Sequence, residues 1–410
     1  MDRKQLPEVW ELKSIGEVCK TGAGGTPLKS NKEYYEGGEI PWLLSGEVAQ
    51  GEIFKSENFI TQVGLENSSA KIFPKNTVLV AMYGATAGQV GILRFEAATN
   101  QAVCGILPNK NFVPEFIYYA LLSKKEELIS KAQGNAQPNI SQLKIKETKI
   151  PVPPIDEQKR IVAILDEAFE GIDQAIRNTE KNLANARELF DSYLNKIFTY
   201  KGNEWEEKVL GQEINLQTGF AFKSKNYTDS CDDIQLLRGD NIMQGFLRWD
   251  DVKRWPKSDR QQYKNYEIDE KDIVLAMDRP WVKAGLKHAQ IQKQDLPCLL
   301  VQRVARLRAK SELNDRFLFY LVGSSTFSKY LLDNQTGIGV PHISGKQIQN
   351  FRFSRPSLEE QYFIIKKLDN LKIETQRLEA IYRQKLASLN ELKQSILQKA
   401  FTGQLTRKSC

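Results

Sequence analysis

The sequence has few of the residues that hold metals or form catalytic triads. Only two histidines, His288 and His342, occur among 410 residues. Histidine-based triads and histidine-rich metal clusters are therefore nearly excluded. The cysteines are scattered and never form a CxxC pair, which favours reduced thiols buried as core fillers over metal ligands. They are Cys19, Cys104, Cys231, Cys298 and Cys410.

Long apolar runs are also missing. No segment approaches the roughly 20 apolar residues that a membrane-spanning helix requires. The segment from Met1 to Trp10 has no apolar stretch typical of a signal peptide. We therefore expect no membrane association and a cytoplasmic location.

Two segments bear a faint likeness to cofactor-binding motifs, and neither is complete. Gly339 to Lys346 superficially suggests a phosphate loop, but five residues separate its glycines and Gln347 replaces the Ser or Thr that would hold magnesium. Asp278 to Trp281 is faintly similar to the acidic-Pro-Pro-aromatic motif of amino-methyltransferases. Arg279 interrupts that motif, and no Gly-rich cofactor loop follows a strand upstream. Because no pair of carboxylates stands out either, we predict no catalytic centre.

What the sequence does contain is enough material for several domains. A chain of 410 residues is too long for one ordinary core. Residues 1–200 carry 23 Lys and Arg against 25 Asp and Glu, and residues 201–410 carry 35 against 26. The net charge is therefore −2 in the first half and +9 in the second. A basic half suggests a polyanionic partner, although a well-solvated basic surface has the same composition.

The same order of motifs occurs twice, which is the strongest signal in the sequence. Two motifs recur 195 positions apart: Trp10-Glu11-Leu12-Lys13 as Trp205-Glu206-Glu207-Lys208, and Val78 to Met82 as Ile273 to Met277. Two later motifs recur 203 positions apart: Pro138-Asn139-Ile140-Ser141 as Pro341-His342-Ile343-Ser344, and Glu157-Gln158 as Glu360-Gln361. The second copy thus contains about eight more residues, and an insertion such as Asp278 to Lys287 fits. We predict a common scaffold with different recognition surfaces.

Each copy divides into a strand-rich part and a long helical part. The strand-rich parts, 1–155 and 200–358, contain short β-type runs, and one helical stretch follows in each, so we predict an α+β domain twice. Over 156–199 and 359–402, apolar residues fall at steps of three and four without a proline, which predicts one long amphipathic helix each. Residues 403–410 form a tail. The β-type runs are Thr77 to Met82, Asp272 to Met277 and Leu299 to Leu307, and the helical stretches lie near Pro114 to Lys131 and Asp315 to Leu332.

Neither long helix can bury its apolar stripe alone. The sequence predicts no other helix of similar length with such a stripe, so each is the natural packing partner of the other. We therefore predict that the two pack as an antiparallel coiled coil with one globular domain at each end. About 44 helical residues span roughly 66 Å. Domains so placed could reach grooves of one DNA duplex that lie a helical turn, roughly 34 Å, or more apart. The alternative is that the coil only dimerises two domains.

Short motifs occur through both copies. In the first they are Pro7-Glu8-Val9-Trp10, Gly24-Gly25-Thr26-Pro27, Tyr34-Tyr35 with Gly37-Gly38, Ile40-Pro41-Trp42, Asn100-Gln101-Ala102-Val103, and Pro151-Val152-Pro153-Pro154 with Glu157-Gln158. In the second they are Thr218-Gly219, Arg238-Gly239-Asp240-Asn241-Ile242, Pro356 with Glu360-Gln361-Tyr362, and the ending Ser395 to Gly403. In this doubled order the sequence resembles the specificity subunits of type I restriction–modification systems, over nearly the whole chain.

The resemblance implies a non-catalytic DNA-recognition subunit. Two target-recognition domains would each read one half of a split double-stranded DNA site, and the helical pair would set the gap and dock two modification (methyltransferase) subunits. Restriction (motor–nuclease) subunits would join afterwards. The resemblance also places S-adenosylmethionine, ATP and magnesium only in those partner subunits, and the complex in a prokaryotic cytoplasm. Because the two recognition domains differ widely in sequence, we expect an asymmetric site.

Base-edge readout requires side chains with fixed donor and acceptor geometry, whereas phosphates accept from Lys, Ser, Thr and backbone amides. Polar loops supply the candidates. In the first domain they are Thr26, Lys29, Ser30, Asn31, Lys32, Tyr83, Thr86, Gln137 and Asn139. In the second they are Lys223, Ser224, Lys225, Arg279, Trp281, Lys283, Arg303 and His342. Arg279 and Lys283 are favoured because they lie in the insertion, and Trp281 is equally compatible with a core position.

Two other classes of function compete with this interpretation. A stand-alone DNA methyltransferase or nuclease with embedded recognition domains would bind S-adenosylmethionine or cleave DNA with magnesium by itself. A non-catalytic coiled-coil adaptor would bind protein without preferring any DNA sequence.

Overall fold

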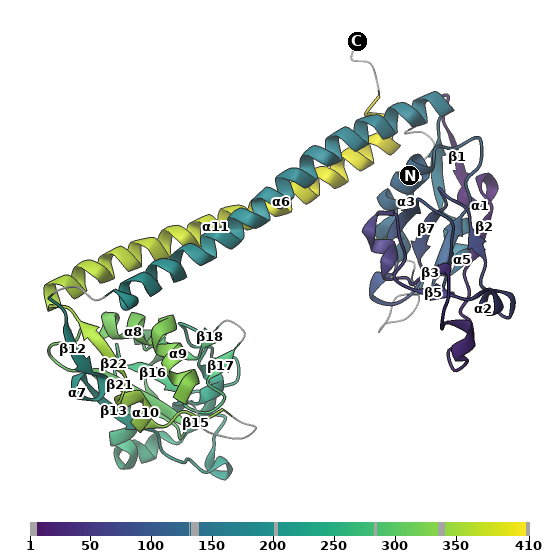
Figure 1. Ribbon diagram of the computed structural model, residues 1–410. Helices are drawn as coiled ribbons and strands as arrows, with labels where there is room; N and C mark the ends of the chain where they lie inside the picture. Colours follow the sequence, from purple (N-terminus) through teal and green to yellow (C-terminus); the bar gives the residue numbers. More distant parts are fainter. Residues whose placement is uncertain are drawn as a thin grey trace. The chain divides into compact units, whose positions relative to one another are not determined.

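The computed structural model describes residues 6–130, 132, 139–200, 204–282, 285–334 and 341–406. The chain forms two compact units. The first unit is Met1–Glu180 with Gln384–Cys410, and the second unit is Lys181–Arg383. Each unit takes one strand-rich domain together with one end of each long helix (Figure 1). The predicted fold class, two α+β domains with two long helices, is confirmed.

The first unit contains two mixed sheets. The larger has the strand order β2-β10-β7-β8-β4 and the smaller has the order β5-β3-β9-β6, while β1 pairs with β11. The strands are β1 Glu11–Ser14, β2 Thr21–Ala23, β3 Ile40–Leu43, β4 Glu52–Ile53, β5 Phe59–Ile60, β6 Ile72–Phe73, β7 Val78–Ala81, β8 Val90–Leu93, β9 Ala97–Thr99, β10 Val103–Ile106 and β11 Lys149–Val152. The short helices are α1 Ile15–Val18, α2 Gln62–Glu66, α3 Pro114–Ser123, α4 Lys125–Ser130 and α5 Gln142–Lys146.

The second unit repeats this plan. Its sheet β13-β21-β16-β19 corresponds to β2-β10-β7-β8, and its sheet β15-β14-β20 corresponds to β5-β3-β9. In both small sheets one pair is parallel, β3 with β9 and β14 with β20. The strands are β12 Glu206–Val209, β13 Ile214–Thr218, β14 Ile234–Leu237, β15 Lys253–Trp255, β16 Ile273–Ala276, β17 Trp281–Val282, β18 Gly285–Leu286, β19 His288–Gln290, β20 Cys298–Leu300, β21 Val304–Ala309 and β22 Arg352–Arg355. The short helices are α7 Leu210–Glu213, α8 Asp315–Gly323, α9 Ser325–Asn334 and α10 Gly345–Gln349.

Three predicted elements are wrong in extent. Each expected helical stretch is two helices, α3 with α4 and α8 with α9. Lys124 leaves the helical region with φ −102° and ψ 4°. Ser324 is extended, and its hydroxyl accepts the Phe327 N–H (3.3 Å), which caps α9. The run Leu299 to Leu307 is two strands, because the chain passes from one sheet to the other through a turn closed by Val304 N–H and the Val301 carbonyl (3.2 Å).

The two long helices are α6, Ile155–Thr199, and α11, Leu358–Phe401. In the first unit, Asp173 of α6 pairs with Lys393 of α11 (2.6 Å). In the second unit, Arg187 of α6 pairs with Glu379 of α11 (3.1 Å). Moving forward along α6 therefore corresponds to moving back along α11, so the helices are antiparallel, as predicted (Figure 1).

Aromatic contacts attach the helix ends to the domains in the same way twice. In the first unit, Phe116 of α3 contacts Phe401 of α11 edge to face, with ring centroids 5.3 Å apart. In the second unit, Phe317 of α8 contacts Phe198 of α6, with centroids 5.2 Å apart. Phe116, Phe401 and Phe317 are buried in the main apolar cluster of their unit, and Phe198 packs against it. The ends of the long helices are therefore part of the domain cores.

The repeated Glu-Gln motif has a structural role at the start of each long helix. The buried Gln158 side chain accepts the Val113 N–H (3.0 Å) and donates to the carbonyls of Asn111 (3.2 Å) and Pro153 (3.0 Å). Gln361 repeats this set with the Asn314 N–H (2.8 Å) and two carbonyls, each at 3.0 Å. One amide thus joins the first helical turn to the loop before α3 or α8.

The cysteine prediction holds for three thiols and is wrong for one. Cys19, Cys104 and Cys298 are buried, and burial raises the pKa of Cys104 and of Cys298 to about 12. Cys231 is exposed, because it lies in a polar segment, residues 229–232, that is exposed throughout. Cys410 lies outside the described residues.

His288 is a buried ring in the core of the second unit. Burial lowers its pKa from 6.5 to about 4, and Nδ1 lies 3.0 Å from the Leu286 carbonyl. The folded state therefore keeps the ring neutral at a pH where the unfolded chain binds a proton. The free energy of unfolding is unaffected by this group above pH 6.5 and falls as the pH drops from 6.5 towards 4.

We expect His288 to reduce the free energy of unfolding by about 2 kcal/mol between pH 7.5 and pH 5. The measurement is chemical denaturation of the full chain at both pH values, with His288→Gln for comparison. The variant should start less stable at pH 7.5 and lose about 2 kcal/mol less on acidification. An equal loss in both proteins would show that the ring titrates normally.

Candidate nucleic-acid interface

A surface hollow of about 660 Å³ in the second unit brings three predicted residues together. Its lining comes from the ends of three strands and from the segment before α10. The lining residues are Gly239, Asp240, Asp278, Arg279, Gln302, Arg303 and His342. Arg279, Arg303 and His342 were selected from sequence, although up to 63 residues separate them.

Backbone hydrogen bonds around Met277 hold these segments in place. The Met277 N–H donates to the Arg303 carbonyl (2.8 Å), and the Met277 carbonyl accepts the Ile343 N–H (2.8 Å). Asp278 and His342 form an isolated β-bridge, and the Arg279 N–H donates to the Pro341 carbonyl (3.1 Å). The side chains that follow Met277 are therefore anchored to buried β16.

Asp278 is the centre of the side-chain contacts. Its Oδ2 lies 2.6 Å from Arg303 Nη1, and its Oδ1 contacts His342 Nδ1. The Asp278 side chain is 21% exposed, whereas those of Arg303 and His342 are 69% and 42% exposed. A half-buried carboxylate thus holds two exposed donor groups at the mouth of the hollow.

Basic side chains lie near this cluster, together with the acidic Asp240. Lys287 is buried beside it, and burial lowers its pKa, with Arg248 and Arg279 acting in the same direction and Asp240 opposing. The Arg279 guanidinium has no ion-pair partner in the described part of the chain. Such a hollow suits an electron-rich ligand with several acceptor atoms.

The first unit has the same backbone arrangement with different side chains. The Met82 N–H donates to the Ala102 carbonyl and the Met82 carbonyl accepts the Ile140 N–H, both at 2.8 Å. Tyr83 and Asn139 form the bridge that Asp278 and His342 form in the second unit. Nearby, the Thr26 hydroxyl donates to the Gln101 amide oxygen. The predicted residues Thr26, Tyr83 and Asn139 thus lie in a neutral counterpart of the charged cluster.

The other predicted residues are more dispersed. Lys29, Ser30 and Lys32 are exposed in the loop after β2, where the Asn31 side chain accepts the Glu33 N–H (3.2 Å) and caps a short helical turn. Thr86 Oγ1 lies 3.4 Å from the Tyr83 carbonyl. Lys223, Ser224 and Lys225 are exposed at a helical turn before β14. Gln137 and Lys283 lie outside the described residues. For all of these, DNA contact stays a prediction.

Trp281 is partly buried and packs against the core of the second unit, as the alternative interpretation expected, and its DNA contact stays a prediction. It begins the β17–β18 hairpin within the predicted insertion and packs against the main apolar cluster of the second unit. Its indole N–H is buried and has no acceptor among the described residues. The insertion is therefore anchored by its aromatic residue.

Sequence reasoning missed Asp278, Gln302 and Asp240, which line the hollow, and the buried Lys287 near it. The available signal was adjacency, because Asp278 precedes Arg279 and Gln302 precedes Arg303. Asp240 lies in the motif Arg238-Gly239-Asp240-Asn241-Ile242, which follows β14. Only the bridge between Asp278 and His342 shows that these motifs meet.

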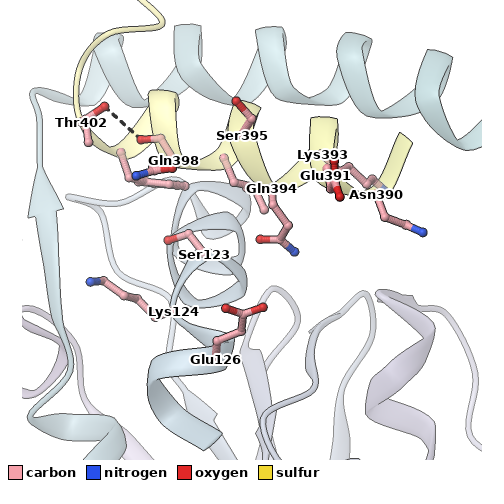
Figure 2. A pocket seen from close by; sticks show the side chains of 12 residues that line it. Ser123, Lys124, Glu126, Asn390, Glu391, Lys393, Gln394, Ser395, Gln398 and Thr402 are labelled. Carbon is pink, nitrogen blue, oxygen red and sulfur yellow. Dashed lines mark hydrogen bonds between the residues drawn. The ribbon is translucent and has the colours of Figure 1, made fainter. Parts of the chain in front are cut away.

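A second hollow, of about 1030 Å³, lies in the first unit between the α3–α4 junction and the last turns of α11 (Figure 2). Ser123, Lys124 and Glu126 face it from one side, and Gln394, Gln398 and other α11 residues face it from the other. At the equivalent place in the second unit, the Ser325 N–H donates to Asn195 Oδ1 (2.8 Å). The mixed polar lining suits contact with a protein more than chemistry on a small molecule.

No metal site is evident in the ranges that the structure describes. There, no three His, Cys, Asp or Glu side chains gather closely enough to hold an ion. None of the helices in those ranges has the length and hydropathy of a membrane span.

Comparison with known proteins identifies the duplicated architecture. A family model described as the type I restriction modification DNA specificity domain matches residues 7–184 and again residues 202–387. The chain belongs to this family. Each match lies within one of the two copies recognised from sequence, and together they confirm the resemblance to type I specificity subunits.

One relative matches over nearly the whole chain, and another is more similar over a shorter segment. The type I restriction enzyme MjaVIII specificity subunit of Methanocaldococcus jannaschii is 27% identical, covering 99% of this chain and 95% of the relative. The EcoAI specificity subunit of Escherichia coli is 39% identical over 41% of this chain and 28% of its own length.

Two solved structures share the fold. A chain from a study of type I R-M complex assembly has a TM-score of 0.79 at 20% identity, covering 98% of this chain and 99% of that one. The HsdS subunit from Thermoanaerobacter tengcongensis has a TM-score of 0.61 at 21% identity, covering 98% of each chain.

Proposed function

We propose that this chain is the specificity subunit that selects the DNA sequence on which a type I restriction–modification complex acts. One observation carries the proposal: the same backbone turn is built in both units but presents Tyr83 and Asn139 in one and Asp278, Arg303 and His342 in the other. A constant scaffold with variable donors and acceptors is what reading two different base sequences requires.

We propose further that each unit reads one half of an asymmetric, bipartite site on double-stranded DNA. The two halves are unlike because the recognition residues are unlike. The antiparallel pair of α6 and α11 joins the two domains by continuous helices, which would fix the gap between the half-sites.

Catalysis belongs, in this proposal, to partner subunits. Two modification subunits would dock on the long helices, and restriction subunits would join them. S-adenosylmethionine, ATP and magnesium would bind in those partners, in a prokaryotic cytoplasm. Support comes from large apolar side chains exposed on α11, since Tyr362 is 61%, Phe363 58% and Ile373 60% exposed.

The test is a selection from a random DNA duplex pool at fixed salt, using the purified full chain with and without a modification subunit. We expect enrichment of a two-part motif with a fixed gap and unlike halves. Binding without sequence preference would favour a coiled-coil adaptor. S-adenosylmethionine binding, or magnesium-dependent cleavage by the chain alone, would favour a stand-alone enzyme.

Arg279→Ala is expected to weaken specific binding by roughly 1 to 3 kcal/mol and to relax one base position. The physical reason is the loss of a guanidinium that has no protein ion-pair partner among the described residues and lines the hollow. Binding of the selected duplex and of single-base variants is measured by titration. Unchanged affinity at every base position would remove Arg279 from the interface.

A further inference from the structure

The turn after β16 contains an arginine where its counterpart contains glycine. In the first unit, Gly84 follows the bridging Tyr83 and has φ +71°. In the second unit, Arg279 follows the bridging Asp278 and has φ +46°. Glycine adopts this left-handed backbone freely, whereas a residue with a Cβ is strained there. The second unit therefore keeps an arginine side chain at a position where glycine would relieve strain.

A second arginine of the same hollow is strained in the same way. Arg303 has φ +65° and lies in the turn that joins β20 to β21. Its counterpart by backbone hydrogen bonding, Ala102, is not among the residues with positive φ. Backbone strain in folded proteins concentrates where a side chain must be aimed for function. Two strained arginines line one surface hollow.

Asp278 orients one of them. Its carboxylate contacts Nη1 of Arg303 (2.6 Å), and its other oxygen contacts His342. Among the described residues, no protein acceptor engages Nε or Nη2 of Arg303. The free edge of the guanidinium thus presents two parallel N–H donors to solvent. This geometry matches the O6 and N7 acceptors of guanine in the major groove.

We propose that this hollow reads a guanine in the half-site of the second unit, through Arg303, with Arg279 beside it. Asp278 acts as a positioning residue, because it fixes the guanidinium plane and leaves the two donors free. The proposal rests on the proposed function. The neutral counterpart in the first unit, with Tyr83, Asn139 and Ala102, has no such donor pair among the residues that the structure describes.

The experiment is the random-duplex selection with the full chain, repeated for Arg303→Lys, Arg303→Ala and Asp278→Asn. Lysine keeps the charge that a phosphate contact needs but loses the two-donor fork. Arg352→Ala is the matched control, because Arg352 belongs to the same unit, is 71% exposed against 69% for Arg303, and also pairs with one acid, Glu207.

We expect the wild-type motif to contain a G·C pair in one half, and Arg303→Lys to lower the preference for that pair roughly 5- to 150-fold. Asp278→Asn should lower it at the same position and nowhere else, and Arg352→Ala should not change it. The inference is overturned if Arg303→Lys leaves the motif unchanged while Arg303→Ala weakens all sequences equally, because that result indicates a phosphate contact. A wild-type motif in which neither half contains a G·C pair also overturns it. Failure of the wild-type chain to enrich any two-part motif would instead refute the proposed function.

Arg279→Gly tests the strain argument through the thermal stability of the free protein. We expect the melting temperature to rise by about 2 to 4 °C, because glycine adopts the left-handed backbone without strain. The same variant should bind the selected duplex more weakly. A lower melting temperature would show that the arginine is kept for stability, which contradicts its assignment to DNA recognition.

Discussion

Phe317→Ala is expected to destabilise the second unit by about 3 to 5 kcal/mol. Phe317 is fully buried in the largest apolar cluster of that unit and contacts Phe198 of α6 at 5.2 Å between ring centroids. Truncation leaves a cavity that the rigid ends of α6 and α8 cannot close, so both the transfer free energy and the packing contacts are lost. Edge-to-face aromatic contact adds to this cost.

The measurement is chemical denaturation of the full chain followed by far-UV circular dichroism and intrinsic fluorescence. A chain with two units need not unfold in one step. If two transitions are seen, we expect Phe317→Ala to shift the one at lower denaturant concentration, because the substitution destabilises the second unit. Phe246→Ala is the matched control, since Phe246 belongs to the same unit and is 56% exposed. If both variants unfolded at the same denaturant concentration, the contact between α6 and α8 would contribute nothing.

Gln361→Ala is expected to lower the free energy of unfolding by about 2 to 4 kcal/mol, because several buried backbone groups lose one shared partner. The side chain is fully buried, and its removal leaves the Asn314 N–H and the carbonyls of Glu312 and Pro356 without this partner. A buried polar group left unpaired costs about 1 to 3 kcal/mol. Gln158→Ala should produce a similar loss in the first unit, because its three hydrogen bonds are equivalent.

The control for both variants is Gln376→Ala, an exposed position on the same long helix as Gln361. Alanine favours helix, so this change is expected to be neutral or slightly stabilising. Thermal unfolding measured at one protein concentration compares the three. Loss of stability at Gln376 equal to that at Gln361 would contradict a specific role for the buried amide.

Much of the architecture could be predicted because it depends on periodic patterns. Heptad-like spacing of apolar residues over 156–199 and 359–402 predicted α6 and α11 to within one residue at each end. The repeats at Trp10 and Trp205, and at Gln158 and Gln361, predicted the duplication. Boundaries set by single contacts were missed. The break between α8 and α9 is one example, because the buried Ser324 hydroxyl accepts the Phe327 N–H and so caps a new helix.

The candidate site was only partly predictable for the same reason. Arg279, Arg303 and His342 could be selected one by one, because residue type and loop position are visible in sequence. Asp278 could not be selected as their organiser, because its role depends on contacts with residues 25 and 64 positions away. Trp281, left open between DNA and core, packs partly buried against the core.

By itself the sequence determined that two copies of one α+β domain alternate with two long helices, because repeated motifs and 3.6-residue periodicity are local properties of the chain. Only the tertiary structure decided which ends of the helices enter which core, and that Asp278, Arg303 and His342 meet in one hollow. Those outcomes depend on hydrogen bonds and packing between segments distant in sequence, where no local pattern specifies the partner.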